Sequence, residues 1–137
     1  GRAAARRWSH RMPDYRNDPS IKDDADVWRR INPKWVKHDP AQGRLRPSSQ
    51  AFQDSTDGTP LSVLLAADLP GPHAALEGHE GYYLAALSVG FVRSLGFVVT
   101  RHPIRDQDPP GHAWIVGRKT SRFRTELARH ATWVVGP

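Results

Sequence analysis

Short apolar runs bounded by turn-forming residues dominate this chain and predict a set of β-strands. Residues 27–31 alternate apolar and charged side chains, as expected of an edge or half-buried strand. The other runs are rich in aromatic and β-branched residues, and they predict strands at 61–67, 97–100, 112–116 and 133–135, with a shorter piece beginning at 35–36. Asp, Pro and Gly at 39–43 predict a turn.

A helix is predicted from Tyr82 to Leu95, because apolar side chains recur there at spacings of three and four and Gly96 supplies a stop. This segment is apolar nearly all round, which is typical of a central helix packed against a sheet. Gly90 within it indicates the close approach of a neighbouring backbone.

The segment 112–131 is expected to form a strand, a tight turn at Gly117 and an amphipathic helix. Thr120 or Ser121 offers the N-cap hydroxyl. Phe123, Leu127 and Ala131 follow at intervals of four residues, so they share one helical face. The mixture of elements predicts an α+β domain over residues 27–137, with a small, mostly antiparallel sheet, one central apolar helix and this second, C-terminal amphipathic helix.

Residues 1–26 are predicted to be a basic, polar N-terminal arm, flexible rather than part of the core. The arm contains five arginines and few apolar residues, with Trp8 and Tyr15 as its anchors. Its small-residue start at 1–5 could be foreign to the native chain, and sequence alone does not decide between a tail and a nucleic-acid-binding arm.

Cationic side chains crowd the start of the C-terminal helix, where the helix dipole alone disfavours them. A docked anion would resolve this conflict by binding free backbone N–H groups and the side chains together. The alternative is a solvated basic turn. The candidate anion- or nucleic-acid-binding residues are Arg44, Arg46, Arg118, Lys119, Thr120, Arg122 and Arg124.

The overall charge strengthens the case for an anionic partner without identifying it. Lys and Arg number 20 against 14 Asp and Glu, which gives a net charge of +6 and suits a nucleic acid, a nucleotide or an acidic protein surface. No cysteine is present, so disulfides and thiol catalysis are excluded. No apolar run is long enough for a membrane span. We expect a cytoplasmic protein with no membrane partner.

Several side chains are candidates for acid–base or nucleophilic chemistry in a cleft. They are Arg30, Ser48, Ser49, His79, Glu80 and His112. The seven histidines lack the spacing of a familiar metal-ligand set, so no metal site is predicted, and no cofactor is indicated. Whether the protein is an enzyme stays open at this stage.

The chain resembles a group of small, uncharacterised bacterial proteins with no assigned activity. The resemblance covers about residues 27–131 and is carried by the segments 27–31, 46–52, 61–63, 78–81, 95–96 and 112–120. It implies a compact bacterial domain and transfers no catalytic residue.

A fainter similarity is to the ADP-ribosyltransferase-like fold, in which a first-strand arginine and a serine motif hold NAD. Arg30 corresponds to the arginine, and Ser48 with Ser49 to the serine motif. A Glu-x-Glu element is missing, and only Glu80 or Glu126 is available as the acidic residue. The resemblance implies an enzyme acting on a nucleotide or NAD-like substrate.

Three functional hypotheses follow from the sequence. The first is a small basic module that binds phosphate-bearing ligands, nucleic acid or nucleotide, and charge together with the helix start favours it. The second is the nucleotide- or NAD-directed enzyme. The third is a protein-interaction module of a larger bacterial assembly, with an acidic protein as its partner.

Overall fold

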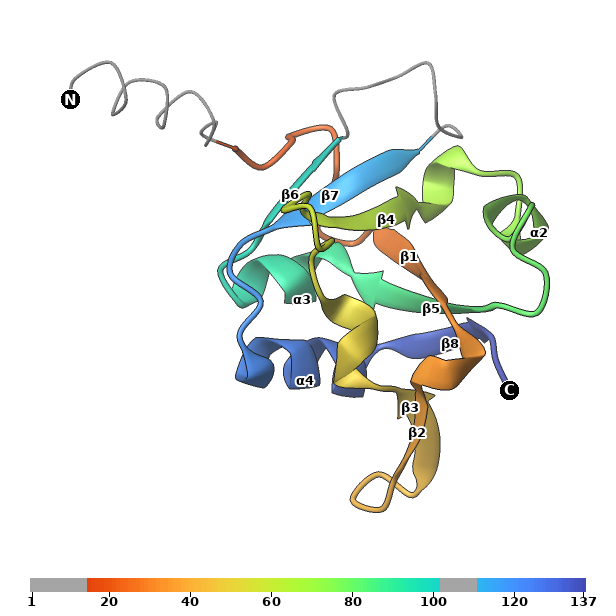
Figure 1. The fold of residues 1–137 in the computed structure, drawn as a ribbon. Helices are drawn as coiled ribbons and strands as arrows, with labels where there is room; N and C mark the ends of the chain where they lie inside the picture. Colours follow the sequence, from red (N-terminus) through yellow and green to blue (C-terminus); the bar gives the residue numbers. More distant parts are fainter. Residues whose placement is uncertain (1–14, 102–110) are drawn as a thin grey trace.

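A six-stranded antiparallel sheet organises the molecule (Figure 1). The computed structural model describes residues 15–101 and 111–137. The strands follow the spatial order β6-β7-β4-β1-β5-β8. Their bounds are β1 Asp26–Ile31, β4 Leu61–Leu65, β5 Tyr83–Ser88, β6 Val98–Arg101, β7 His112–Val116 and β8 Thr132–Val135. The described chain is therefore α+β with an antiparallel sheet, as the sequence predicts.

A separate hairpin and short helices complete the fold. The hairpin pairs β2 (Val36–Asp39) with β3 (Arg44–Pro47), and the predicted turn joins the two strands. The α-helices are α2 (Pro72–Ala75), α3 (Val89–Ser94) and α4 (Ser121–His130), and the 3-10 turns are η1 (Pro33–Trp35), η2 (Ser49–Phe52) and η3 (Ala66–Asp68). Within the described ranges, no helix has the length and apolar character needed to cross a membrane.

The main core lies between one face of the sheet and the elements α3, α4 and η2. Ile31, Leu87 and Ile115 from the sheet pack with Phe52 of η2 and Leu127 of α4, and all of these side chains are almost fully buried. A smaller cluster on the opposite face joins Leu64, Leu84 and Ala75, the last from α2. The sheet is thus covered unevenly on its two faces.

The helix predicted from Tyr82 to Leu95 is wrong over residues 83–88, which form β5. This strand lies between β1 and β8, and its side chains enter both core clusters, Ala85 on one side and Leu84 on the other. A strand buried on both faces is apolar at consecutive positions, so its pattern also satisfies the helical spacing. Only the short α3 is helical, with the Ser88 hydroxyl accepting a hydrogen bond from Phe91 N at its start.

The other predicted elements agree with the structure, with local differences. The strand at 27–31 is confirmed as β1, but it pairs with β4 on one side and β5 on the other and is therefore an interior strand. The amphipathic C-terminal helix is confirmed as α4, with Thr120 as its N-cap. The close approach predicted at Gly90 is also confirmed, since Gly90 N donates to Asp23 O at 2.8 Å.

Residues 15–25 of the predicted arm pack against the domain, whereas residues 1–14, with Trp8, lie outside the described residues. The Asn17 side-chain oxygen accepts hydrogen bonds from Val99 N of β6 at 2.8 Å and from Arg93 Nε at 3.0 Å. Ile21 is 3% exposed and joins the main core. Tyr15 contacts Trp114 edge to face, as expected of an anchor.

Asn17→Ala is expected to lower the free energy of unfolding by about 1–3 kcal/mol, because a backbone N–H of β6 and the Arg93 guanidinium both lose an acceptor. Urea denaturation measures the change. Asp24→Ala is the control, since Asp24 is exposed and bonds to no residue in the described ranges. Equal stability of the two variants would show that the segment does not contribute to folding.

Candidate functional site

Strands β1 and β4 separate after a short ladder and leave a cleft in the sheet. Their pairing covers only Val27 with Leu65 and Trp28 with Leu64, whereas β1 pairs with β5 along its full length. We call the resulting cavity, of about 240 Å³, the β1–β4 cleft. It is lined by Trp28, Arg29, Arg30, Trp35, Ser62, Val63, Leu64, His79, Tyr82 and His112.

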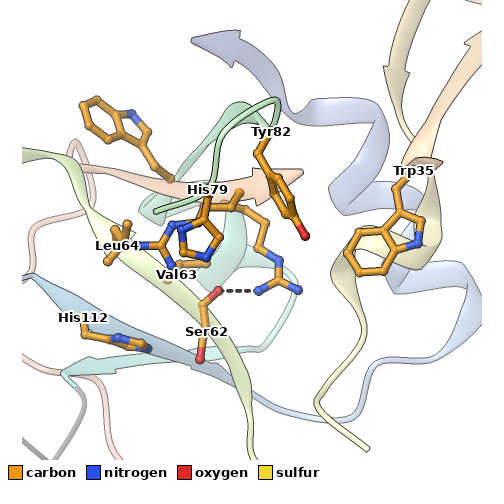
Figure 2. Close-up of a pocket in the computed structure, with 10 residues that line it drawn as sticks. Trp35, Ser62, Val63, Leu64, His79, Tyr82 and His112 are labelled. Carbon is orange, nitrogen blue, oxygen red and sulfur yellow. Dashed lines mark hydrogen bonds between the residues drawn. The ribbon is translucent and has the colours of Figure 1, made fainter. Parts of the chain in front are cut away.

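The Arg29 guanidinium bridges the gap where the ladder stops. Its Nε donates to Ala51 O at 2.9 Å, and its Nη1 donates to Ser62 O at 3.0 Å, the bond drawn as a dashed line in Figure 2. Val27, Arg29 and Ile31 alternate along β1, so Arg29 points to the same face as two fully buried side chains. The alternation in β1 thus places the Arg29 side chain beside the main core.

The Arg29 guanidinium is a partly buried cation with no carboxylate partner in the described ranges. Burial, and to a lesser degree the neighbouring Arg30, lowers the pKa of Arg29 to about 10, so the side chain is still cationic at neutral pH. Among the residues described, no carboxylate pairs with it, and its Nη2 has no hydrogen-bond partner. A partly buried cation in this condition favours an anion in the cleft.

Aromatic side chains flank the guanidinium. Figure 2 shows Trp35 on one side of the cleft and His79 with Tyr82 on the other, with the Tyr82 hydroxyl directed toward the space between them. His79 and Tyr82 contact edge to face with ring centroids 5.4 Å apart. Asn32 contacts both sides of the cleft. Its side chain caps η1, which contains Trp35, and it donates a hydrogen bond to the Tyr82 hydroxyl at 3.4 Å.

The chemistry of the lining is cationic and aromatic. Arg30 joins Arg29 there, and its Nε donates to Ala75 O at 2.6 Å. No Asp or Glu is among the described residues that line the cleft. The arrangement can therefore hold a planar group between rings and an anionic group against a guanidinium.

The six candidate catalytic residues do not converge on one site. Arg30, His79 and His112 line the β1–β4 cleft. Ser48 and Ser49 line a different hollow, beside α4, and Glu80 is exposed and lines neither cavity. The structure brings half of the predicted set together.

At the predicted anion site before α4, two of the candidate residues, Lys119 and Thr120, are bound to internal partners. The Lys119 ammonium donates to Asp54 Oδ1, Ile115 O and Gly117 O at 2.7–2.9 Å, and its side chain is only 4% exposed. Desolvation lowers the pKa of Lys119, and the Asp54 carboxylate opposes that shift. The Thr120 hydroxyl caps the helix by accepting from Phe123 N.

The other candidates for anion binding differ in their surroundings. Arg118 and Arg122 are exposed. Arg124 is partly buried, and its Nε has no hydrogen-bond partner within 15–101 and 111–137. Arg44 Nη2 donates to the carbonyls of Arg129 and Ala131, so it caps the end of α4. Arg46 is buried and forms an ion pair with a carboxylate of the hairpin.

The candidate site residues predicted from the sequence do not include Arg29, Trp35 or Tyr82. A signal for Arg29 is the alternation in β1, which places a charged side chain on the buried face. Tyr82 begins the predicted helix, and Trp35 begins the short apolar piece predicted at 35–36. Their common location depends on where β1 and β4 separate, which no local pattern encodes.

Comparisons of the chain with family models, with curated proteins and with solved structures find no match. Within the described ranges, no group of three or more His, Asp or Glu side chains is placed to hold a metal ion. The class that the fold and site define is thus an antiparallel α+β domain with a cationic, ring-lined cleft in its sheet.

Asp54→Asn is expected to lower the free energy of unfolding by about 1–3 kcal/mol, because the buried Lys119 ammonium loses its carboxylate. Lys119→Met should cost less in the Asp54→Asn background than in the wild type, since the two side chains are in direct contact. Urea denaturation of the four proteins measures this coupling. Strictly additive costs would show that the pair contributes no interaction energy.

Proposed function

We propose that the protein binds a small anionic ligand that carries a planar ring, of the nucleotide type, in the β1–β4 cleft. The observation that carries the proposal is the partly buried Arg29 guanidinium, which has no carboxylate partner in the described chain and lies between aromatic walls. A phosphate or carboxylate of the ligand would pair with Nη2 of this guanidinium. Arg geometry suits both kinds of anion.

The aromatic walls support the ring of the ligand. Trp35 and Tyr82 stand on opposite sides of the cleft, and their positions are held by hydrogen bonds of the neighbouring backbone and of Asn32. Stacking of a base on such rings contributes about 1–3 kcal/mol. Rings fixed in advance lose little side-chain entropy on binding.

The size of the cleft favours a single small ligand over a nucleic-acid strand. A cavity of about 240 Å³ accommodates one ring system with its attached groups, whereas a strand requires a continuous track for several bases. The net charge of +6 would attract such an anionic ligand at long range. We therefore favour a nucleotide over nucleic acid within the phosphate-binding hypothesis.

A nucleotide- or NAD-directed enzyme is the alternative, and the two cleft histidines favour it. His79 and His112 line the same cavity as Arg29 and are of the type that performs acid–base chemistry. The described lining, however, offers no carboxylate to accompany them. Binding without turnover is accordingly the function we put first.

The proposal predicts that adenosine 5′-monophosphate binds more tightly than adenosine or inorganic phosphate alone, because it uses both the rings and the guanidinium. Arg29→Gln should weaken this binding at least about ten-fold, since a charged hydrogen bond is lost. Quenching of tryptophan fluorescence measures the affinity, as Trp28 and Trp35 both line the cleft.

Arg118→Gln is the matched control, because it removes the same charge from an exposed side chain. It should leave the affinity within about two-fold of the wild type. Wild-type affinity in Arg29→Gln, or no binding up to about 1 mM nucleotide, would reject the proposal. Release of nicotinamide from NAD, abolished by His79→Ala, would instead favour the enzyme.

A further inference from the structure

A second hollow, between the β2–β3 hairpin, η2 and α4, carries a separate inference. We call it the basic hollow; its volume is about 410 Å³, and it is lined by Lys34, Lys37, Arg46, Ser48, Ser49, Gln50, Thr125 and Arg129. None of these residues lines the β1–β4 cleft. We propose that the basic hollow is a binding site for a phosphate group.

The charge of the hollow is strongly positive. Lysines from η1 and β2 and arginines from β3 and α4 surround it, and no Asp or Glu is among the described residues of its lining. Asp39, behind the hollow, pairs with Arg46 at 2.7 Å and lies 3.9 Å from Arg129 Nε. One carboxylate leaves most of this charge uncompensated, which a multiply charged anion would neutralise.

Hydrogen bonds to Asp39 and Pro47 fix the orientation of the Arg46 guanidinium. Its side chain is only 6% exposed, its Nε donates to Asp39 and its Nη1 donates to Pro47 O at 2.8 Å. Asp39 is fixed in turn by the backbone amides of Ala41 and Gln42, and the hydrogen bond from Arg46 contributes most to lowering the pKa of Asp39. The remaining amino group, Nη2, has no bond to any residue in the described ranges and is available to a ligand.

The Ser48 hydroxyl is an independent observation that points to a ligand. It is buried and has no hydrogen-bond partner among the described residues, although the backbone N–H of Ser48 is satisfied by Trp35 O at 2.7 Å. A buried hydroxyl without a partner lowers stability, so a structure that keeps one needs a reason. A phosphate oxygen in the hollow would accept this hydrogen bond.

The chemistry selects phosphate over a carboxylate. Phosphate presents several charged oxygens in a tetrahedral arrangement, and the hollow offers cations from four different elements around one space. The hydroxyls of Ser49 and Thr125 and the amide of Gln50 add neutral donors to the cations. A planar carboxylate would use only part of this set.

The phosphate could be a free ion or part of a nucleotide that reaches the hollow from the cleft. A third depression, of about 480 Å³, shares Arg29, Trp35 and Ser62 with the cleft and Gln50 with the basic hollow. The third depression therefore borders both the cleft and the basic hollow. The inference does not depend on the proposed function, because the two sites have no lining residue in common.

The test is titration of the full chain with inorganic phosphate and separately with adenosine 5′-monophosphate, followed by the amide resonances in nuclear magnetic resonance spectra. Phosphate should shift the amide resonances of Arg46, of residues 48–50 and of residues 125–129. Lys37→Glu with Arg129→Glu should weaken phosphate binding at least about ten-fold, because two cations become carboxylates.

The matched control is Arg118→Glu with Arg122→Glu, which changes the net charge equally at the other end of α4, where both side chains are exposed. It should alter phosphate affinity by less than about three-fold. An equal loss in both double variants would reject a built site and indicate a general charge effect. Absence of saturable binding would overturn the proposal as well.

Ser48→Ala separates a ligand role from a structural one. Phosphate affinity should fall about five-fold, while the midpoint of thermal unfolding without ligand stays equal or rises, since the unpartnered hydroxyl is gone. A fall in thermal stability with unchanged affinity would contradict the proposal.

Titration with the nucleotide distinguishes a free phosphate ion from the phosphate group of a nucleotide bound in the cleft. If the Lys37/Arg129 variant weakens binding of both phosphate and the nucleotide, one ligand spans both sites; if it weakens phosphate alone, the hollow takes a free ion. Inorganic phosphate carries no ring, so its binding in the basic hollow does not require the aromatic walls of the cleft. Failure of nucleotide binding therefore rejects the cleft without affecting the basic hollow.

Discussion

The hydrogen bonds of Arg29 replace the part of the sheet that β1 and β4 do not form. Where the ladder between these strands ends, Nε and Nη1 of one guanidinium take over the carbonyls of Ala51 and Ser62. The same side chain therefore links β1 to β4 beyond the end of their ladder and ties both strands to η2, which carries the buried Phe52. Structure and candidate chemistry depend on a single residue here, and for this reason a variant at Arg29 needs its folding measured beside its binding.

Several basic side chains in the described ranges form hydrogen bonds that hold the fold together. Lys119 holds the turn before α4, Arg44 caps the end of that helix, and Arg93 fastens the N-terminal segment through Asn17, Asp18, Ile21 and Asp23. The net charge of +6 is therefore a weaker guide to the ligand than the charges of the residues that line each cavity. Arg29, which lines the cleft, is partly buried, and Arg46, which lines the basic hollow, is almost wholly buried. Of these two, the sequence marks only Arg46 as a candidate for anion binding.

The sequence predicts much of the fold because most of its elements carry local signals. Thr120 before an amphipathic stretch, Gly117 after an apolar run, and the turn at 39–43 all lie where local chemistry places them. The pattern fails at β5, because a strand covered on both faces and a buried helix are equally apolar. The pattern fails for the site for a different reason. Trp35 of η1, Arg29 of β1 and Tyr82 of the loop before β5 come from three separate segments, and they line one cleft only because β1 and β4 separate.

The packed segment before β1 also protects the sheet from association with other chains. Strand β6 lies at the edge of the sheet, where unpaired backbone groups form a template for another strand. Asp18 N donates to Val99 O, and the Asn17 side chain accepts from Val99 N, so the segment occupies both backbone groups of this residue without forming a full strand. A chain cleaved within this segment would keep its cavities but present an open edge, and it would be prone to form strand-exchanged dimers or fibrils.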